Sequence, residues 1–288
     1  SPKQYAFNFL SRNKGVTYEN LKLRDPVYGE DINHWYSDLV RADQGFKMPA
    51  VNPPPPMFTP FSIGKLTLQN RVVVAPMCQY SAKDGTPTDW QLVHLGNFAK
   101  GGAGLVITEM TNVSPEGRIS HQCTGLYNSD HVPAWRRVVD FIHNETNSKI
   151  CVQLGHAGRK ASCNIGWVDG GASLKNDKWQ ILAPSSIPFS PKSAIPKEMD
   201  RSDMDKVRDD YVRSAQMAAE AGFDMIEFHG AHGYLLSSFI SPISNVRTDN
   251  YGGSLENRMR FPLEVLSAVR DVWPSEKPIS VRISAEDW

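Results

Sequence analysis

The sequence predicts an α/β protein of the TIM (β/α)8 barrel type that stops after its fifth strand. Short runs rich in β-branched residues alternate with longer stretches of helical character, which is the pattern of repeated strand–helix units. The strand runs are almost continuously apolar, as expected for parallel strands buried on both faces. Such units can build a doubly wound sheet or a barrel, and the residues after the first strand separate the two.

A doubly wound sheet that binds a dinucleotide carries a Gly-x-Gly-x-x-Gly turn directly after its first strand. In this sequence the first strand ends at Ala75 and continues into Pro76-Met77-Cys78-Gln79-Tyr80, which has no such turn. Polar and aromatic residues instead gather just past the ends of several strands, where barrels place their active sites. These observations favour the barrel.

Five strands are expected, in chain order, at residues 72–75, 104–108, 149–153, 224–228 and 279–283. Helices are expected between them, at residues 89–100, 131–146, 202–221 and 254–272. The last two helices open on Ser202 and Ser254, which are suited to N-capping. Glycines after residue 100 and at Gly222 are expected to end the first and third helices.

Residues 1–56 are expected to form an N-terminal extension, followed by the barrel domain at residues 57–288. The extension is polar, carries scattered aromatic residues such as Trp35 and Tyr36, and closes on the four prolines Pro53-Pro54-Pro55-Pro56. A proline run of this kind forms a semi-rigid extended linker. We expect the extension to pack on the barrel domain or on a partner subunit, and the chain to form a homo-oligomer.

Composition and charge narrow the classes of function. The net charge is 0, with 31 basic and 31 acidic side chains, so nothing builds the positive field that nucleic acid or an anionic membrane requires. No apolar run approaches the roughly 20 residues of a membrane span, and the start has no signal-peptide pattern. The four cysteines lack the density of a disulfide scaffold. We therefore expect a cytoplasmic protein with free thiols, no metal and a small-molecule ligand.

The densest group of reactive side chains follows the fourth strand, in the segment His229-Gly230-Ala231-His232-Gly233-Tyr234. We expect it to form one loop at the carboxyl end of that strand. Two histidines can bind a metal, act as a base with its partner, or donate together to one oxygen. A metal would need a further ligand, for which only Glu227 is near. Paired donors, with Tyr234 placed to deliver a proton, are the favoured interpretation.

In this segment and in several others along the chain, the sequence resembles the old yellow enzymes, a family of flavin-dependent ene-reductases. The likeness runs in order through most of the chain and is therefore specific. Its motifs lie at residues 57–58, 63–64, 70–81, 88–90, 153–160, 223–234, 241–245, 247–258 and 281–284. The resemblance implies a barrel that carries FMN at the carboxyl ends of its strands. It also implies that NADPH or NADH reduces the flavin, which passes hydride to a small molecule with an activated alkene.

The resemblance also implies roles for individual residues. The residues implied to contact the flavin are Ala75, Pro76, Met77, Cys78, Met110, Gln153 and Arg282. In particular, Gln153 would bond the pyrimidine edge, and Arg282 would sit by N1 and the C2 carbonyl, where a cation stabilises the reduced flavin. Met110 departs from the family, which usually has a small residue there. A flavin contact through the backbone amide would tolerate this side chain.

The substrate half of the site follows from the same resemblance. Cys78 and Tyr80 resemble the thermophilic-like subgroup, in which the cysteine tunes the flavin potential and the tyrosine touches substrate. His229 and His232 would hold the carbonyl oxygen of the substrate and withdraw charge from the alkene. Tyr234 would then protonate the α-carbon. These three residues are the predicted catalytic residues.

The sequence stops at Trp288, after five strands, whereas a closed barrel of this type needs eight. In the family the last units hold the flavin phosphate, so two alternatives to an ene-reductase stay open. The chain could be a non-catalytic scaffold or partner-binding paralogue, or a flavin-dependent isomerase or cyclase of a natural-product intermediate. The polar run from Arg247 to Arg258 is expected to be structural, a hydrogen-bonded loop that leads into the last helix.

Overall fold

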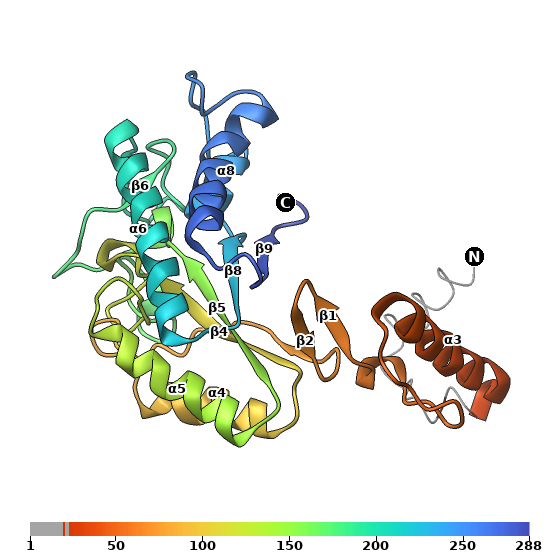
Figure 1. Ribbon diagram of the computed structural model, residues 1–288. Coiled ribbons are helices and arrows are strands. Elements are labelled where there is room, and N and C mark those ends of the chain that lie inside the picture. Colours follow the sequence, from red (N-terminus) through yellow and green to blue (C-terminus); the bar gives the residue numbers. More distant parts are fainter. Residues whose placement is uncertain (1–19, 21–22, 288) are drawn as a thin grey trace. The chain divides into compact units, whose positions relative to one another are not determined.

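The computed structural model describes residue 20 and residues 23–287, and contacts between residues divide the chain into two units. The first comprises Ser1–Ser62 and Thr67–Val72, and the second Ile63–Leu66 and Val73–Trp288. This division does not coincide with the boundary predicted after Pro56. Figure 1 shows the elements of both units.

The first unit contains a 19-residue helix, α3 (Pro26–Gln44), that the sequence analysis did not predict. The Asp25 side chain caps its start by accepting from the backbone N–H of Tyr28, and Gly45 ends it in the left-handed conformation at φ 69°. After the prolines come a short 3-10 helix, η1 (Pro56–Phe58), and a two-stranded sheet of β1 (Phe61–Ile63) and β2 (Leu66–Leu68).

The second unit is built on a five-stranded parallel sheet in the order β3-β4-β5-β8-β9. Each strand pairs with the one before it in this series, as in successive units of a barrel. The five predicted strands are confirmed at these bounds: β3 (Val73–Val74), β4 (Leu105–Asn112), β5 (Lys149–Gly155), β8 (Met225–Gly230) and β9 (Ile279–Ile283). Three of them run two to four residues beyond the predicted carboxyl ends.

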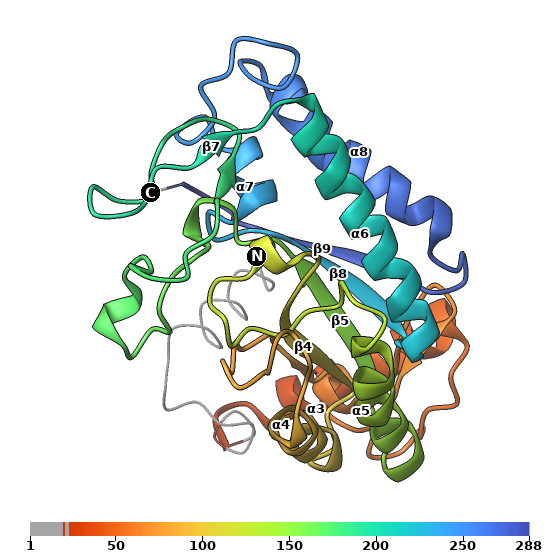
Figure 2. The same ribbon diagram turned by 90° about the vertical axis from the view of Figure 1, so that its left-hand side faces the viewer.

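Four long helices connect these strands: α4 (Asp89–Lys100), α5 (His131–Glu145), α6 (Arg201–Ala221) and α8 (Leu255–Val272). Helix α4 packs on α5, α5 on α6 and α6 on α8, and Figure 2 shows α6 and α8 side by side along the sheet. Ser254 caps α8 as predicted, but the prediction for Ser202 is wrong. Asp200 caps α6 through a reciprocal capping box with Asp203, which moves the start of the helix back to Arg201.

The core lies between the sheet and these helices. All eight residues of β4 are buried, and Trp135 and Phe223 meet edge to face with ring centroids 5.6 Å apart. Tyr211 stacks on Phe228 from α6 to β8, also at 5.6 Å. The two edge strands are the exceptions, because Val73 of β3 is 45% exposed and Val281 and Ile283 of β9 are 48% and 64% exposed. The described part of β9 pairs on one side only, with β8.

Short elements cover the carboxyl ends of the strands. They are η2 (Pro115–Gly117), η3 (Gly158–Lys160), η4 (Asp169–Gly171), the pair β6 (Leu182–Ala183) and β7 (Lys197–Glu198), and α7 (Leu235–Ile240). Helix α7 was not predicted. It packs against β6 and η3, so the segments after β5 and β8 lie together.

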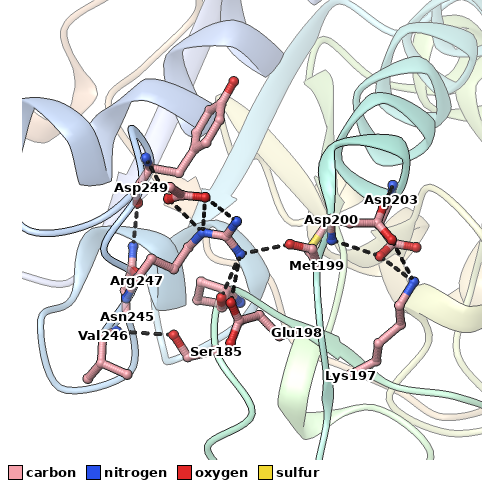
Figure 3. A network of polar contacts seen from close by, with 12 residues as sticks. Ser185, Lys197, Glu198, Met199, Asp200, Asp203, Asn245, Val246, Arg247 and Asp249 are labelled. Atoms are coloured by element: carbon pink, nitrogen blue, oxygen red, sulfur yellow. Dashed lines mark hydrogen bonds and ion pairs between the residues drawn. The ribbon is translucent and has the colours of Figure 1, made fainter.

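The segment after α7 is held by one buried arginine (Figure 3). The Arg247 side chain is only 7% exposed, and its Nη1 donates to the carbonyl oxygens of Pro184 at 2.9 Å and Met199 at 2.7 Å. Its Nε and Nη2 donate to the Asp249 carboxylate. We call Arg247, Asp249 and these two carbonyls the Arg247 clamp. The expectation that this run is a hydrogen-bonded structural loop agrees with these contacts.

Candidate active site

The predicted catalytic residues lie where β8 passes into α7, and not all of them are on a loop. His229 is the fifth residue of β8, which runs to Gly230, so its ring is placed by the sheet. His232 lies in the connecting turn at φ 60°, and Tyr234 is the N-cap residue of α7. A left-handed backbone is uncommon outside glycine and is often associated with functional sites. The expectation of one loop was therefore wrong for His229.

The three rings form one cluster. Nε2 of His229 lies 3.3 Å from Nδ1 of His232, and their ring centroids are 5.0 Å apart. The Tyr234 ring lies 4.9 Å from that of His229 and 6.5 Å from that of His232, edge to face in both cases. The backbone N–H of Ala231 donates to Nδ1 of His229 at 3.3 Å, so Nε2 of that ring carries the hydrogen.

Burial and nearby cations keep both imidazoles neutral. Burial, together with the charges of His232, Arg282 and Lys160, lowers the pKa of His229 to about 3. Burial also lowers the pKa of His232, again with contributions from Arg282 and Lys160. Near neutral pH each ring is therefore a hydrogen-bond donor through one N–H and not a cation.

A second segment of the site, Cys78 to Tyr80, is held by a residue that the sequence analysis missed. Oε2 of the buried Glu109, at the carboxyl half of β4, accepts from the backbone N–H of Gln79 at 3.0 Å, and its Oε1 accepts from Nε2 of Gln91, also at 3.0 Å. Tyr80 next to it is left-handed at φ 50°. The sequence did hold a signal for Glu109, because an acidic residue in an otherwise apolar strand must have buried hydrogen-bonding partners.

The two segments meet on a shared apolar cluster. Buried side chains that include Met110 and Cys123 support it, and Cys78, Tyr80 and Tyr234 pack against them. Burial raises the pKa of Cys78 to about 12, so its thiol stays protonated. Met110 fits because Gly155 has no side chain: a Cβ there would lie 2.6 Å from Cγ of Met110. The structure thus brings Cys78, Tyr80 and the β8–α7 residues together.

Gln153 and Arg282 lie on the neighbouring strands. Arg282 of β9 is in register with His229, and Gln153 of β5 with Glu227 of β8, whose Oε1 accepts from Nε2 of Gln153 at 2.8 Å. Within the described part of the chain, the half-buried guanidinium of Arg282 has no hydrogen-bonding or ion-pair partner. The described residues contain no group of histidine, cysteine and acidic side chains that could hold a metal.

Comparison with known proteins places this geometry in a family. Residues 56–288 match the model of the NADH:flavin oxidoreductase / NADH oxidase family. This is most of the chain and includes every site residue described above. The chain belongs to this family.

Relatives in the family include curated proteins from a fungus and a bacterium. The chain is 45% identical to an NADH:flavin oxidoreductase of Gibberella zeae, over 81% of this chain and 57% of that protein. It is 44% identical to an NADPH dehydrogenase of a Geobacillus species, over 81% of this chain and 64% of that protein. The chain therefore spans about three fifths of the length of the curated relatives that it matches.

Solved structures in the family share the fold. Morphinone reductase superposes with a TM-score of 0.69 at 33% identity, over 79% of this chain and 61% of that one. An old yellow enzyme from Pichia superposes with a TM-score of 0.71 at 34% identity, over 79% of this chain and 59% of that one. The predicted fold, a partial barrel of the old yellow enzyme family, is thereby confirmed. No helix among the described residues is long and apolar enough to cross a membrane.

The family's flavin fits the side chains found here. Ala75 and Met77 are exposed and Pro76 is half-buried, so the segment after β3 is open to a ligand. The amide of Gln153 has both donor and acceptor groups, and Arg282, which has no hydrogen-bonding or ion-pair partner among the described residues, would supply the positive charge that a reduced flavin requires. The side chain of Met110 belongs to the buried apolar cluster, and that of Cys78 packs against it.

Proposed function

We propose that this chain contributes the active site of an FMN-dependent oxidoreductase that reduces an activated C=C bond, with NADPH or NADH as the reductant. The observation that carries the proposal is the ring cluster, in which Tyr234 packs 4.9 Å from His229 and the two imidazoles lie within hydrogen-bonding distance. Two neutral donors beside a phenol suit a carbonyl oxygen that gains negative charge while a nearby carbon is protonated.

The histidines bind and polarise the substrate. In the structure the Nε2–H of His229 points its hydrogen bond at Nδ1 of His232. A carbonyl oxygen would replace that nitrogen as the acceptor, and His232 would add its own ring N–H. Because both rings are neutral, neither would lose its hydrogen to the substrate, and the charge that develops on the oxygen would be stabilised by hydrogen bonds alone.

FMN, when bound, supplies the hydride that goes to the β-carbon of the alkene. The residues that would hold it are Ala75, Pro76, Met77, Cys78, Met110 (through its backbone), Gln153 and Arg282. Tyr80, which meets Trp167 edge to face at 5.6 Å, would form a wall of the substrate site. Tyr234 would donate its Oη proton to the α-carbon, and water would restore that proton afterwards.

The test is turnover of the protein reconstituted with FMN, with 2-cyclohexenone and NADPH under anaerobic conditions. We expect flavin absorbance and NADPH-dependent loss of the enone. The variant Tyr234→Phe should lower the rate of enone reduction by about 100-fold or more, the usual contribution of a general acid, without slowing flavin reduction by NADPH. Tyr127→Phe, in which the altered tyrosine packs on His131 instead, should be unaffected. If no flavin binds and no enone is consumed, the proposal is wrong.

A further inference from the structure

One lysine links the two loops of the site. Lys160 is the last residue of η3, after β5, and its Nζ donates to the carbonyl oxygen of His232 at 3.0 Å. The same nitrogen lies 4.8 Å from the centroid of the Tyr234 ring. A cation within about 6 Å of an aromatic centroid is attracted to the face of the ring. We propose that Lys160 stabilises the phenolate that Tyr234 becomes on giving up its proton, and that it holds His232 in place.

In the part of the chain that the structure describes, no acidic side chain pairs with Lys160. Among residues 23–287 it forms no ion pair, and the centroid of the Phe189 ring also lies close to it, 4.5 Å from Nζ. Burial and the neighbouring Arg159 lower its pKa, while Cys163 acts in the opposite direction. A cation that is half-buried and not neutralised acts more strongly on nearby groups than one in water. The titratable groups of the site on which it acts are Tyr234 and the two imidazoles.

Proton transfer from Tyr234 leaves a negative phenolate, which the positive charge of Lys160 would stabilise. This inference rests on the proposed function, in which hydride reaches the β-carbon and the alkene electrons move toward the α-carbon and the carbonyl oxygen. The O–H bond of Tyr234 then breaks as a C–H bond forms at the α-carbon, and the phenolate takes a proton from water. Burial raises the pKa of Tyr234, so its phenolate is costly to form. An opposite charge a few ångströms away lowers that cost.

Lys160 also fixes the backbone of His232. The peptide of His232 is held from both sides, because its N–H donates to Oγ of Ser284 at 3.0 Å while its carbonyl oxygen accepts from Lys160. Both contacts support the left-handed φ of 60°. The charged and titratable groups that face His232 are Lys160, Arg282, His229 and Tyr234, and both cations disfavour protonation of the imidazoles.

The experiment places 3,5-difluorotyrosine at position 234 and follows the phenol by fluorine NMR as pH rises, with no flavin present. Lys160→Met keeps the apolar stem of the side chain and removes the charged amine, so the phenol should titrate at higher pH than in the parent protein. Lys160→Arg should restore the parent value. Lys100→Met, at the exposed end of α4, is the matched control and should change nothing. An unchanged phenol titration in folded Lys160→Met protein would overturn the proposal.

A kinetic measurement on the FMN-reconstituted protein separates this role from packing. Lys160→Met should slow reoxidation of the reduced flavin by the enone about tenfold, with Lys160→Arg recovering most of the rate, and should leave flavin reduction by NADPH within about twofold. Equal slowing of both half-reactions would indicate a structural role and count against the proposal. Failure of the parent protein to consume enone would refute the proposed function, whereas the fluorine titration tests Lys160 independently.

Discussion

The β8–α7 turn and the Arg247 clamp are two polar segments less than twenty residues apart, and they use their polar groups in opposite ways. In the clamp, the guanidinium of Arg247 bonds two backbone carbonyls and the Asp249 carboxylate, so it is saturated within the protein. In the turn, the guanidinium of the adjacent Arg282 has no partner within the described chain, and His232 holds a strained φ. We take this difference to distinguish a segment that stabilises the fold from one that, under the proposed function, binds a ligand.

This comparison predicts that the clamp carries stability. Arg247→Met should lower the free energy of unfolding by about 3 kcal/mol, because two carbonyl oxygens lose their donor at a side chain that is only 7% exposed. The exposed ion pair with Asp249 should add little. Urea denaturation of the purified protein measures the loss. Arg213→Ala, which removes an exposed arginine of α6, should cost less than half as much, and equal losses would remove the distinction.

Acid should affect the two regions differently. When folding lowers the pKa of a histidine, the folded state binds fewer protons than the unfolded state at pH values between the two pKa values. The stability that this histidine contributes is complete above its unfolded pKa and is lost as pH falls toward its folded pKa. For His229 this window runs from 6.5 down to about 3. Within that window His229 should lower the free energy of unfolding by about 1.4 kcal/mol for each pH unit of acidification. His229→Gln should remove this contribution.

Unfolding free energies at pH 7 and pH 5 supply the measurement. Buried His156, whose pKa is lowered to about 4 mainly by burial, should contribute a second slope of the same sign, so His229→Gln is expected to reduce the pH dependence and not to abolish it. Arg247→Met should lower stability by the same amount at both pH values, since Asp249 titrates below this range. A parent protein equally stable at both pH values would contradict the assignment of His229.

The sequence was a good guide to the parts of the fold that depend on local pattern. Helix α4 has its predicted bounds because Thr88 and Gln91 form a capping box at its start and Gly101 ends it, and β9 has its predicted bounds because its apolar run is sharply limited. Helix α7 has only six residues, too few to display a helical period. Asp200 outcompeted Ser202 as a cap because its box partner Asp203 is placed to reciprocate.

Residue patterns alone indicated the candidate site only where its residues lie close together in sequence, and the family resemblance implied the distant Cys78, Tyr80, Gln153 and Arg282. His229, His232 and Tyr234 were found because three polar rings occur within six residues. Glu109 and Lys160 were not found, because their contacts join residues 30 and 72 positions apart and depend on the pairing of strands. The metal interpretation was set aside on residue types, and the choice of paired donors still depends on the proposed function.

The smallest expected effect concerns the strain at His232. At a φ of 60° a residue with a Cβ is disfavoured, whereas glycine adopts this conformation without strain, so His232→Gly should be more stable than His232→Ala by about 1 kcal/mol. Both variants lose the imidazole, so the difference in their stability isolates the effect of the backbone.

Arg260, exposed within α8 near the clamp, is the matched position. There the order should reverse, because glycine destabilises a helix interior by about 1 kcal/mol relative to alanine. Thermal unfolding of the four variants gives both differences. If the alanine variant were the more stable one at both positions, the backbone of His232 would be unstrained. The β8–α7 turn would then be an ordinary structural segment, as the clamp is.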